Sequence, residues 1–229
     1  MINPWLPERH RILEIIEETD MESTFVVEFN EPSIRHGQFF QISLPKIGEA
    51  PISVSNFTDS TIEFTIRKVG TLTNVLFDLH AGDDLYIRGP YGNGFPLEDF
   101  KGKHIIVIAG GTGVSPVRST LNHYLNNPQD CKDVYAIAGF RDAQHVLFEN
   151  DLTKWRNAPH FHTTLTLDQG ERVGFQEGFA MKYVKDIPFQ DFQNDYAVII
   201  VGPPVMMKFT AQECMKYGVT EDHIYVSFE

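Results

Sequence analysis

The chain changes its rhythm near residue 100, and this change constrains the fold more than any other feature. Between residues 10 and 98 the hydrophobic residues fall into short runs rich in β-branched and aromatic side chains, separated by turn-forming segments. Runs of this kind predict the strands of an antiparallel β-barrel or sandwich. The runs are RILEII, STFVVEF, QFFQISL, PISVS, TIEFTIR and DLYIRG, and a short helix is predicted over Thr73–His80.

After Lys103, strand-like runs alternate with helical ones. The predicted strands are HIIVIAGG, VYAIAGF, FHTTLTL, YAVIIVG and HIYVSF, and the predicted helices are SPVRSTLNHYLNN, LFENDLTKW and PVMMKFTAQECMKYG. Strands that are apolar throughout are typical of a sheet buried on both faces, and the alternation predicts a doubly wound parallel α/β sheet. We therefore expect two domains, a barrel over residues 1–99 and an α/β domain over residues 100–229, with the boundary within Leu97–Lys103.

Composition excludes several classes of protein. The chain has 19 Lys and Arg residues against 31 Asp and Glu residues, and the resulting net charge of −12 opposes binding to the phosphate backbone of a nucleic acid. It has no apolar run long enough to cross a membrane and no secretory signal pattern at its N-terminus, so we expect a cytoplasmic protein with no membrane partner.

The strongest local signal is the glycine-rich turn GGTGVSP at residues 110–116, directly after the strand HIIVIA. Glycines let a phosphate approach peptide N–H groups closely, and the N-terminus of a helix favours negative charge. Ser115 is the predicted N-cap of the following helix, and Pro116 is its predicted first residue. The turn therefore indicates a dinucleotide site, and the alternative is a glycine-rich connector with no ligand.

Other turns repeat this arrangement. Gly202-Pro203-Pro204 also follows an apolar strand and opens a helix, so it and the first turn can face one crevice at the carboxyl edge of the sheet. In the β-rich half, Gly70 and Thr71 stand just ahead of the predicted short helix, where an anion could bind. A hairpin followed by a capped helix explains that segment equally well.

An antiparallel barrel with P-x-S and G-x-x-T motifs, followed by a sheet domain with GGTGxxP and G-P-P-x-M, resembles the ferredoxin–NADP reductase superfamily over residues 10–229. Within it the chain resembles an electron-transfer branch that includes subunits of dihydroorotate dehydrogenase and sulfhydrogenase. The segments EAPISVS, GPYGNGFP and VGPPVMM look most like the B subunits of anaerobic sulfite reductase. The resemblance implies an FAD-dependent oxidoreductase subunit that passes electrons from NADH to iron–sulfur and sulfite-reducing partner subunits.

The resemblance also implies the roles of individual residues, with Ser53 as the catalytic residue, hydrogen-bonded near the reactive flavin nitrogen. The implied cofactor-binding residues are Pro51, Ile52, Ser53 and Val54 at the flavin ring, Arg67, Val69, Gly70, Thr71 and Thr73 at the ribityl and diphosphate groups, Gly110, Gly111, Thr112, Gly113 and Val114 at the nicotinamide dinucleotide, and Gly202, Pro203, Pro204 and Met206 beside the nicotinamide.

The preference between NADH and NADPH depends on the segment after the third predicted strand of the second domain. NADP-specific members of the superfamily place Ser and Arg there, whereas this chain has Asp168 and Glu171. A carboxylate accepts a hydrogen bond from a ribose 2′-hydroxyl but repels a 2′-phosphate. We therefore expect NADH, with Asp168 as a cofactor-binding residue. Arg172 is the argument for the opposite preference.

The sequence departs from the superfamily in ways that keep other functions open. Most flavin-binding members have Arg where this chain has Ala50, so Arg67 or Lys68 would have to compensate. Close relatives carry a cysteine-rich lobe with a [2Fe–2S] cluster, which needs four thiolates, and Cys131 and Cys214 cannot supply them. The alternatives are a free-standing flavin reductase, an electron-transfer subunit of a dihydroorotate dehydrogenase or hydrogenase, and a binding module without redox function.

Overall fold

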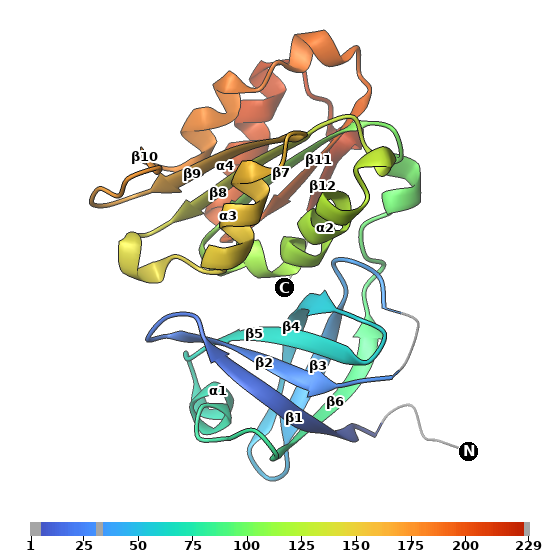
Figure 1. The fold of residues 1–229 in the computed structure, drawn as a ribbon, viewed down its shortest axis with the longest axis vertical. Coiled ribbons are helices and arrows are strands. Elements are labelled where there is room, and N and C mark those ends of the chain that lie inside the picture. Colours follow the sequence, from blue (N-terminus) through green and yellow to red (C-terminus); the bar gives the residue numbers. More distant parts are fainter. Residues whose placement is uncertain (1–5, 31–33, 227–229) are drawn as a thin grey trace. The chain divides into compact units, whose positions relative to one another are not determined.

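The computed structural model of the chain describes residues 6–30 and 34–226. The chain forms two compact units that are joined between Phe95 and Pro96 (Figure 1). The change in sequence pattern places this boundary slightly later, within Leu97–Lys103. The first unit is an antiparallel barrel and the second an α/β sheet domain, which confirms the fold class predicted from the sequence.

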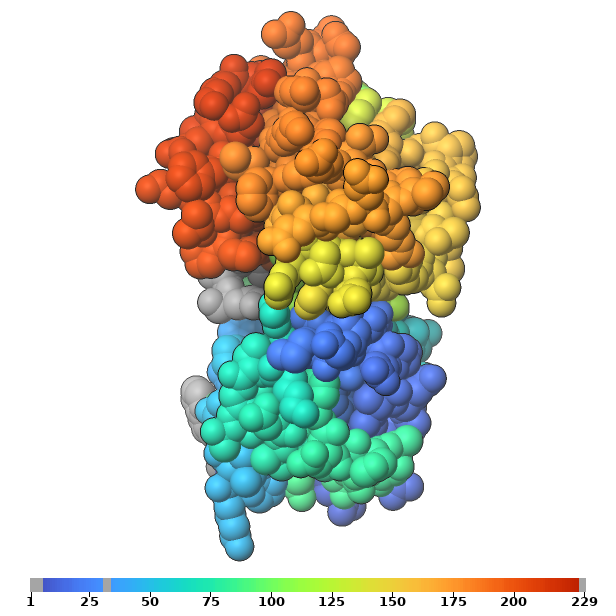
Figure 2. Space-filling model, turned by 90° about the vertical axis from the view of Figure 1, so that its left-hand side faces the viewer, coloured from blue at the N-terminus to red at the C-terminus, as the bar shows by residue number. Residues whose placement is uncertain are grey.

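The barrel is closed, with the strand order β1-β2-β5-β4-β3-β6 and antiparallel pairing throughout. All six predicted strands are present, and the predicted short helix is shorter and begins two residues earlier. The elements are β1 (Glu8–Glu17), β2 (Glu22–Glu28), β3 (Phe39–Leu44), β4 (Gly48–Phe57), β5 (Thr61–Arg67), α1 (Thr71–Leu76) and β6 (Asp84–Tyr91). The β3–β4 turn projects from the barrel as the light-blue tip in Figure 2.

Side chains alternate along β3, and this alternation separates two neighbouring phenylalanines. Phe40 and Ile42 lie in the barrel core, whereas Phe39 is half-buried on the outer face. Phe39 therefore lies outside the barrel core. Its ring lies 5.6 Å from the ring of Tyr91, and in register it faces Ser53 on β4. Phe39, Ser53 and Tyr91 thus lie side by side on the outside of the barrel.

The second unit contains a parallel sheet with the strand order β10-β9-β8-β7-β11-β12. The two-residue strand β10 was not predicted. The elements are β7 (His104–Gly110), α2 (Val114–Asn126), β8 (Val134–Phe140), α3 (Glu149–Asn157), β9 (Phe161–Leu167), β10 (Gln176–Glu177), β11 (Tyr196–Val201), α4 (Pro204–Lys216) and β12 (Ile224–Val226), with 3-10 helices that include Gly111–Gly113 and Ala180–Asp186.

Helices cover both faces of this sheet (Figure 1). Ile106 and Ile108 of β7 pack in a core cluster with residues of α4 and of the 3-10 helix Ala180–Asp186, which are red and orange in Figure 2. Ile105 and Val107 alternate with them and are equally buried, and α2 packs against β7. The doubly wound arrangement explains why the strands read as continuous apolar runs.

The strand order reverses between β7 and β11, which are neighbours in space although β8 and β9 lie between them in the chain. Parallel strands all end at the same edge of the sheet, so Gly110 after β7 and Gly202 after β11 meet at this switch point. Doubly wound sheets bind ligands in the crevice that forms there. The topology therefore places both predicted glycine turns at one edge.

The start of α2 differs from the prediction. The helix begins at Val114 with Gly113 as its N-cap, after a 3-10 turn over Gly111–Gly113. Ser115 is inside the first turn, and its buried hydroxyl has no hydrogen-bond partner. The predicted cap at Ser115 is wrong because the glycine turn continues directly into the helix. Pro116 is consequently the third helical residue, a position where its missing N–H still costs nothing.

Candidate nucleotide-binding site

A cavity of about 450 Å³ opens at the carboxyl edge of the parallel sheet. Its walls come from the ends of β7, β8 and β9 and from the segment that leads into α4, so it lies at the switch point of the strand order. It contains five residues predicted from the sequence. The lining residues are Gly110, Gly111, Gly139, Phe140, Arg141, Asp168, Phe179, Ala180, Met181, Pro203, Val205, Met206 and Phe209.

Two glycines let the ends of β7 and β11 approach each other closely. Gly202 has a φ of +157°, and a Cβ there would lie 2.9 Å from Sδ of Met206 and 3.3 Å from the backbone nitrogen of Gly110. Met206 also covers Gly110, where a Cβ would lie 3.4 Å from its terminal methyl group. The Gly-Pro-Pro turn therefore positions the Met206 side chain over the glycine turn after β7.

Gly113 has a different role from its neighbours. It is buried and does not line the cavity, and a Cβ there would lie 2.6 Å from the carbonyl oxygen of Val201 and 2.7 Å from Cα of Gly202. Its φ is −62°, so the constraint is steric contact with backbone atoms rather than an unusual conformation. Gly113 lets the start of α2 pack against the end of β11. Val114, the next residue, is fully buried and does not line the cavity either.

Asp168 follows directly after β9 and lines the cavity. Its backbone N–H donates to the carbonyl oxygen of Phe140 at 2.9 Å. This bond extends the β8–β9 pairing by one residue and holds the backbone from which the Asp168 side chain projects. Burial raises the pKa of this carboxyl group. A carboxylate at the end of a strand in this kind of sheet is placed to accept hydrogen bonds from ribose hydroxyls.

One wall of the cavity is apolar, and the sequence analysis missed it. Phe179, Val205 and Phe209 are large hydrophobic side chains that remain exposed. Exposed apolar groups gathered around a cavity indicate a binding surface for a flat apolar group. Gly139, the residue before the last in β8, lines the same cavity, and a Cβ there would lie 3.0 Å from Cβ of Ala180.

The predicted flavin residues lie on β4, at the end of β5 and on α1. Ser53 is buried on the outer face of the barrel, beside Phe39. Ile52 and Val54 point the other way, into the barrel core, so a flavin contact at these positions would come from their backbone. The side chains that accompany Ser53 on the outer face are Phe39 and Tyr91, which the sequence analysis did not select.

The turn before α1 is held together by the hydroxyl group of Thr73. The backbone N–H groups of Val69 and Gly70 both donate to Thr73 Oγ1 at 2.9 Å, and the hydroxyl donates to the carbonyl oxygen of Gly70. These two N–H groups are therefore not free for a phosphate. The first residues of α1, Thr71 and Leu72, keep N–H groups that the helix itself cannot satisfy.

The cations near this turn are not equally available. Arg67 forms an ion pair with the buried carboxylate of Glu22, with a distance of 3.4 Å between Nε and Oε1. Lys68 lies over the ring of Phe77, with its ammonium nitrogen 5.5 Å from the ring centre. Arg67 and Lys68 were the two residues expected to compensate for Ala50. Of these, Lys68 is the more available to a phosphate, because its described contact is with a ring and not with a carboxylate.

Metal ligation finds no support among the described residues. No group of three or more His, Cys, Asp or Glu residues within residues 6–30 and 34–226 could hold a metal ion. Cys131 and Cys214 are buried free thiols, and burial raises their pKa to about 11 and about 12. Thiols of this kind stay protonated, whereas metal ligands are thiolates. In the same part of the chain, no helix is long and apolar enough to cross a membrane.

Comparisons with known proteins agree with this geometry. The oxidoreductase NAD-binding domain family matches residues 107–212. The gamma subunit of sulfhydrogenase 2 from Pyrococcus furiosus is 32% identical over 247 residues, which cover 100% of this chain and 85% of that protein. The electron transfer subunit of dihydroorotate dehydrogenase B (NAD(+)) from Streptococcus mutans is 30% identical over 228 residues, with 96% of this chain and 77% of that protein covered.

Among solved structures, a ferredoxin NADP+ reductase from Neisseria gonorrhoeae with bound FAD and NADP has a TM-score of 0.81 at 18% identity, and the match covers 96% of this chain and 97% of that one. The family match defines the class as oxidoreductases with an NAD-binding domain. The chain has the fold of a ferredoxin NADP+ reductase. It belongs to the family that includes the gamma subunits of sulfhydrogenase and the electron transfer subunits of dihydroorotate dehydrogenase B.

Proposed function

We propose that the chain is an electron-transfer subunit that takes electrons from NADH through FAD and delivers them to a partner subunit. The observation that carries this proposal is the cavity at the switch point of the parallel sheet, with glycines at the ends of its strands and Asp168 after β9. The two relatives described above are subunits of a sulfhydrogenase and a dihydroorotate dehydrogenase, which supports a role within a redox complex.

The cavity fits a nicotinamide dinucleotide. The glycine edge at Gly110 and Gly111 admits a diphosphate next to the backbone, Asp168 can accept hydrogen bonds from a ribose, and the exposed rings of Phe179 and Phe209 can contact a flat base. Met206 closes the side next to Gly110. Each chemical part of the ligand therefore has a matching group on the protein.

The barrel can hold a flavin nucleotide although it lacks the arginine that most flavin-binding members of the superfamily have in place of Ala50. Thr71 and Leu72 offer unsatisfied N–H groups for a diphosphate, Lys68 offers a positive charge, and Gly70 faces open space on the side where a Cβ would be. Ser53 can donate a hydrogen bond on the outer face, flanked by the ring of Phe39. A diphosphate next to this turn favours FAD over FMN.

When bound, FAD supplies the conversion between the two-electron chemistry of NADH and single-electron transfer. The protein orients the reactants, with Ser53 holding the ring edge and Asp168 the ribose of the dinucleotide. We further propose that the acceptor is a sulfite-reducing complex, because the segments EAPISVS, GPYGNGFP and VGPPVMM resemble anaerobic sulfite reductase B subunits. A hydrogenase or dihydroorotate dehydrogenase partner is the second candidate, which the two relatives favour.

An anaerobic titration tests the proposed function. The chain purified with its native flavin should show the visible absorbance of a bound flavin, and NADH should bleach that absorbance stoichiometrically. Release of FMN instead of FAD on denaturation, or a bound flavin that NADH cannot reduce, would show that the proposal is wrong. Adding sulfite-reducing subunits or hydrogenase subunits to the reduced protein then distinguishes the two candidate partners by which of them reoxidises the flavin.

Replacing Asp168 with asparagine should lower kcat/KM for NADH about tenfold, because a charge-assisted hydrogen bond to the ribose is lost. The value for NADPH should stay unchanged or rise, since a negative charge near a 2′-phosphate is removed. Glu171→Gln is the matched control, because Glu171 lies in the same loop but does not line the cavity. Steady-state rates with a one-electron dye as acceptor give kcat/KM for NADH and for NADPH. Equal losses with the two nucleotides would contradict a role at the ribose.

A further inference from the structure

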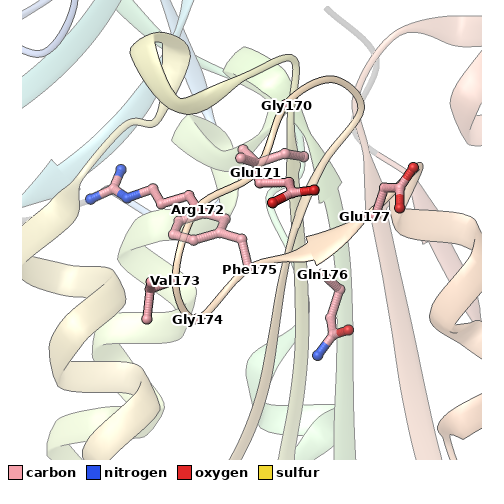
Figure 3. A pocket seen from close by; sticks show the side chains of 9 residues that line it. Gly170, Glu171, Arg172, Val173, Gly174, Phe175, Gln176 and Glu177 are labelled. Carbon is pink, nitrogen blue, oxygen red and sulfur yellow. The ribbon is translucent and has the colours of Figure 1, made fainter.

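Residues 168–175 form the loop between β9 and β10. The loop begins at the wall of the nucleotide cavity and contains two glycines, Gly170 and Gly174. It partly encloses a hollow of about 560 Å³, lined by residues 170–177 and Leu167 (Figure 3). Asp168, Glu171 and Arg172 are the charged residues of this loop. Arg172 is therefore its single cation, and how that cation is held determines the charge that the loop presents.

Arg172 is held by Glu149, the first residue of α3. Its two terminal nitrogens donate to the two carboxylate oxygens at 2.6 and 2.9 Å, which is the parallel two-bond geometry typical of a strong arginine–carboxylate pair. The guanidinium also lies 5.0 Å from the centre of the Phe175 ring. In Figure 3 the Arg172 side chain extends away from the side of the loop on which Glu177 lies.

A second contact ties the same loop to the same helix. Gly174 has a φ of +84°, and a Cβ there would lie 2.7 Å from the guanidinium nitrogens of Arg156. Arg156 and Glu149 are two helical turns apart on α3, so they project from the same face of the helix. The loop is therefore docked on α3 at two points, and Arg172 is turned towards the helix by the docking.

This arrangement has an electrostatic consequence for a nucleotide in the cavity. Arg172 follows Asp168 by four residues, so their Cα atoms are at most about 14 Å apart, and both belong to the loop that begins at the cavity wall. Glu149 neutralises the charge of Arg172 and occupies one edge of its guanidinium. A 2′-phosphate near Asp168 would then lack Arg172 as a counter-charge, and the cation left at the cavity wall is Arg141, which pairs with Asp142 at 3.7 Å. A 2′-hydroxyl would not be disfavoured.

We propose that Glu149 is a positioning residue that sets the preference for nucleotides without a 2′-phosphate, by withholding Arg172 from the ribose. This inference rests on the proposed function of the cavity. It resolves the opposing roles of Asp168 and Arg172, because the arginine is present but already paired. Breaking the pair should therefore convert Arg172 into a phosphate-binding group without any change to the residues that line the cavity.

Calorimetric titration of the full chain with ADP-ribose and with 2′-phospho-ADP-ribose tests this, and it needs no electron transfer. Glu149→Gln should tighten binding of 2′-phospho-ADP-ribose about tenfold, equivalent to about 1.4 kcal/mol, and leave ADP-ribose within about twofold. The gain should shrink as salt is raised, because it comes from a solvent-exposed charge. The variant should fold normally, since an exposed ion pair contributes little stability.

Two variants separate release of Arg172 from a general loss of negative charge. Glu171→Gln removes an equal charge, from the loop rather than from α3, and leaves the Glu149–Arg172 pair in place, so it should leave the affinity ratio nearly unchanged. Adding Arg172→Met to Glu149→Gln should abolish the gain. An equal gain in Glu171→Gln, or a gain that survives Arg172→Met, would overturn the inference. Failure of the wild-type chain to bind ADP-ribose would overturn the proposed function instead.

Discussion

Replacing Asp151 with alanine should lower the free energy of unfolding by about 3 kcal/mol, because it removes the carboxylate from a nearly buried ion pair. Asp151 is 5% exposed, and its carboxylate accepts from Nε of Arg118 at 2.6 Å and from Lys154 at 3.1 Å. Arg118 also stacks over the ring of Phe148 at 4.4 Å, so it cannot turn to solvent without losing that contact. Chemical denaturation measures the change.

The same carboxylate should make stability depend on acidity. Burial alone would raise the pKa of Asp151, but Arg118 and Lys154 together outweigh burial, and the net effect lowers the pKa in the folded protein. The unfolded chain then binds the proton more readily than the folded one, so this contribution to stability is present above the ordinary pKa and is lost as pH falls below it. Asp151→Ala should flatten the acid limb of the stability curve.

Asp195 provides a matched control for this prediction. It forms an ion pair with Lys132 at the same distance of 2.6 Å, but both side chains are close to half exposed. Asp195→Ala should cost less than about 1 kcal/mol, because solvent screens an exposed pair and the freed lysine is rehydrated. Similar losses in the two variants would show that burial does not decide the strength of the Asp151 network.

Replacing Gly113 with alanine should destabilise the second unit by about 2–3 kcal/mol, since the new methyl group would overlap rigid backbone rather than a flexible side chain. The atoms in its way are the carbonyl oxygen of Val201 at 2.6 Å and Cα of Gly202 at 2.7 Å. The affinity for ADP-ribose should fall as well, because β11 must shift away from α2 and carries the Gly-Pro-Pro turn with it. Denaturation and calorimetry measure the two effects.

Gly110→Ala is the control within the same turn. Gly110 has an extended backbone, and its Cβ would meet only the flexible Met206 side chain, at 3.4 Å. We expect almost no loss of stability, but weaker binding of ADP-ribose because a methyl group would enter the cavity. If Gly113→Ala proved as stable as Gly110→Ala, steric contact with β11 could not be the reason for glycine at residue 113.

Sequence patterns predicted the architecture of both units because they are local. Alternation along β3 and the continuous apolar runs of β7, β8 and β11 identify strands buried on one face or on two. The glycines at residues 110 and 202 mark where strands end, and Gly218, with a φ of +89°, ends α4 as predicted. These features depend on neighbours a few residues away, which a sequence displays directly.

Local sequence patterns could not predict which side chains pair when distant segments meet in the folded chain. Ser115 looks like a helix cap, yet the glycine turn makes Gly113 the cap, and the Thr73 hydroxyl is used to close its own turn. The apolar wall at Phe179 and Phe209 forms only when α4 and the segment after β10 meet at the sheet edge. The surroundings of Phe179 and Phe209 therefore depend on which segments, distant in sequence, lie next to them in the fold.

By itself, the sequence determined the two-unit fold, the family and the edge of the sheet at which the dinucleotide turns meet. Only the tertiary structure decided which charged groups remain available there. Arg172 is one residue from Glu171 in the chain, but its partner is Glu149, 23 residues earlier on α3. Periodicity and turn chemistry are short-range properties, whereas the charge at a site is the sum over groups that folding brings together.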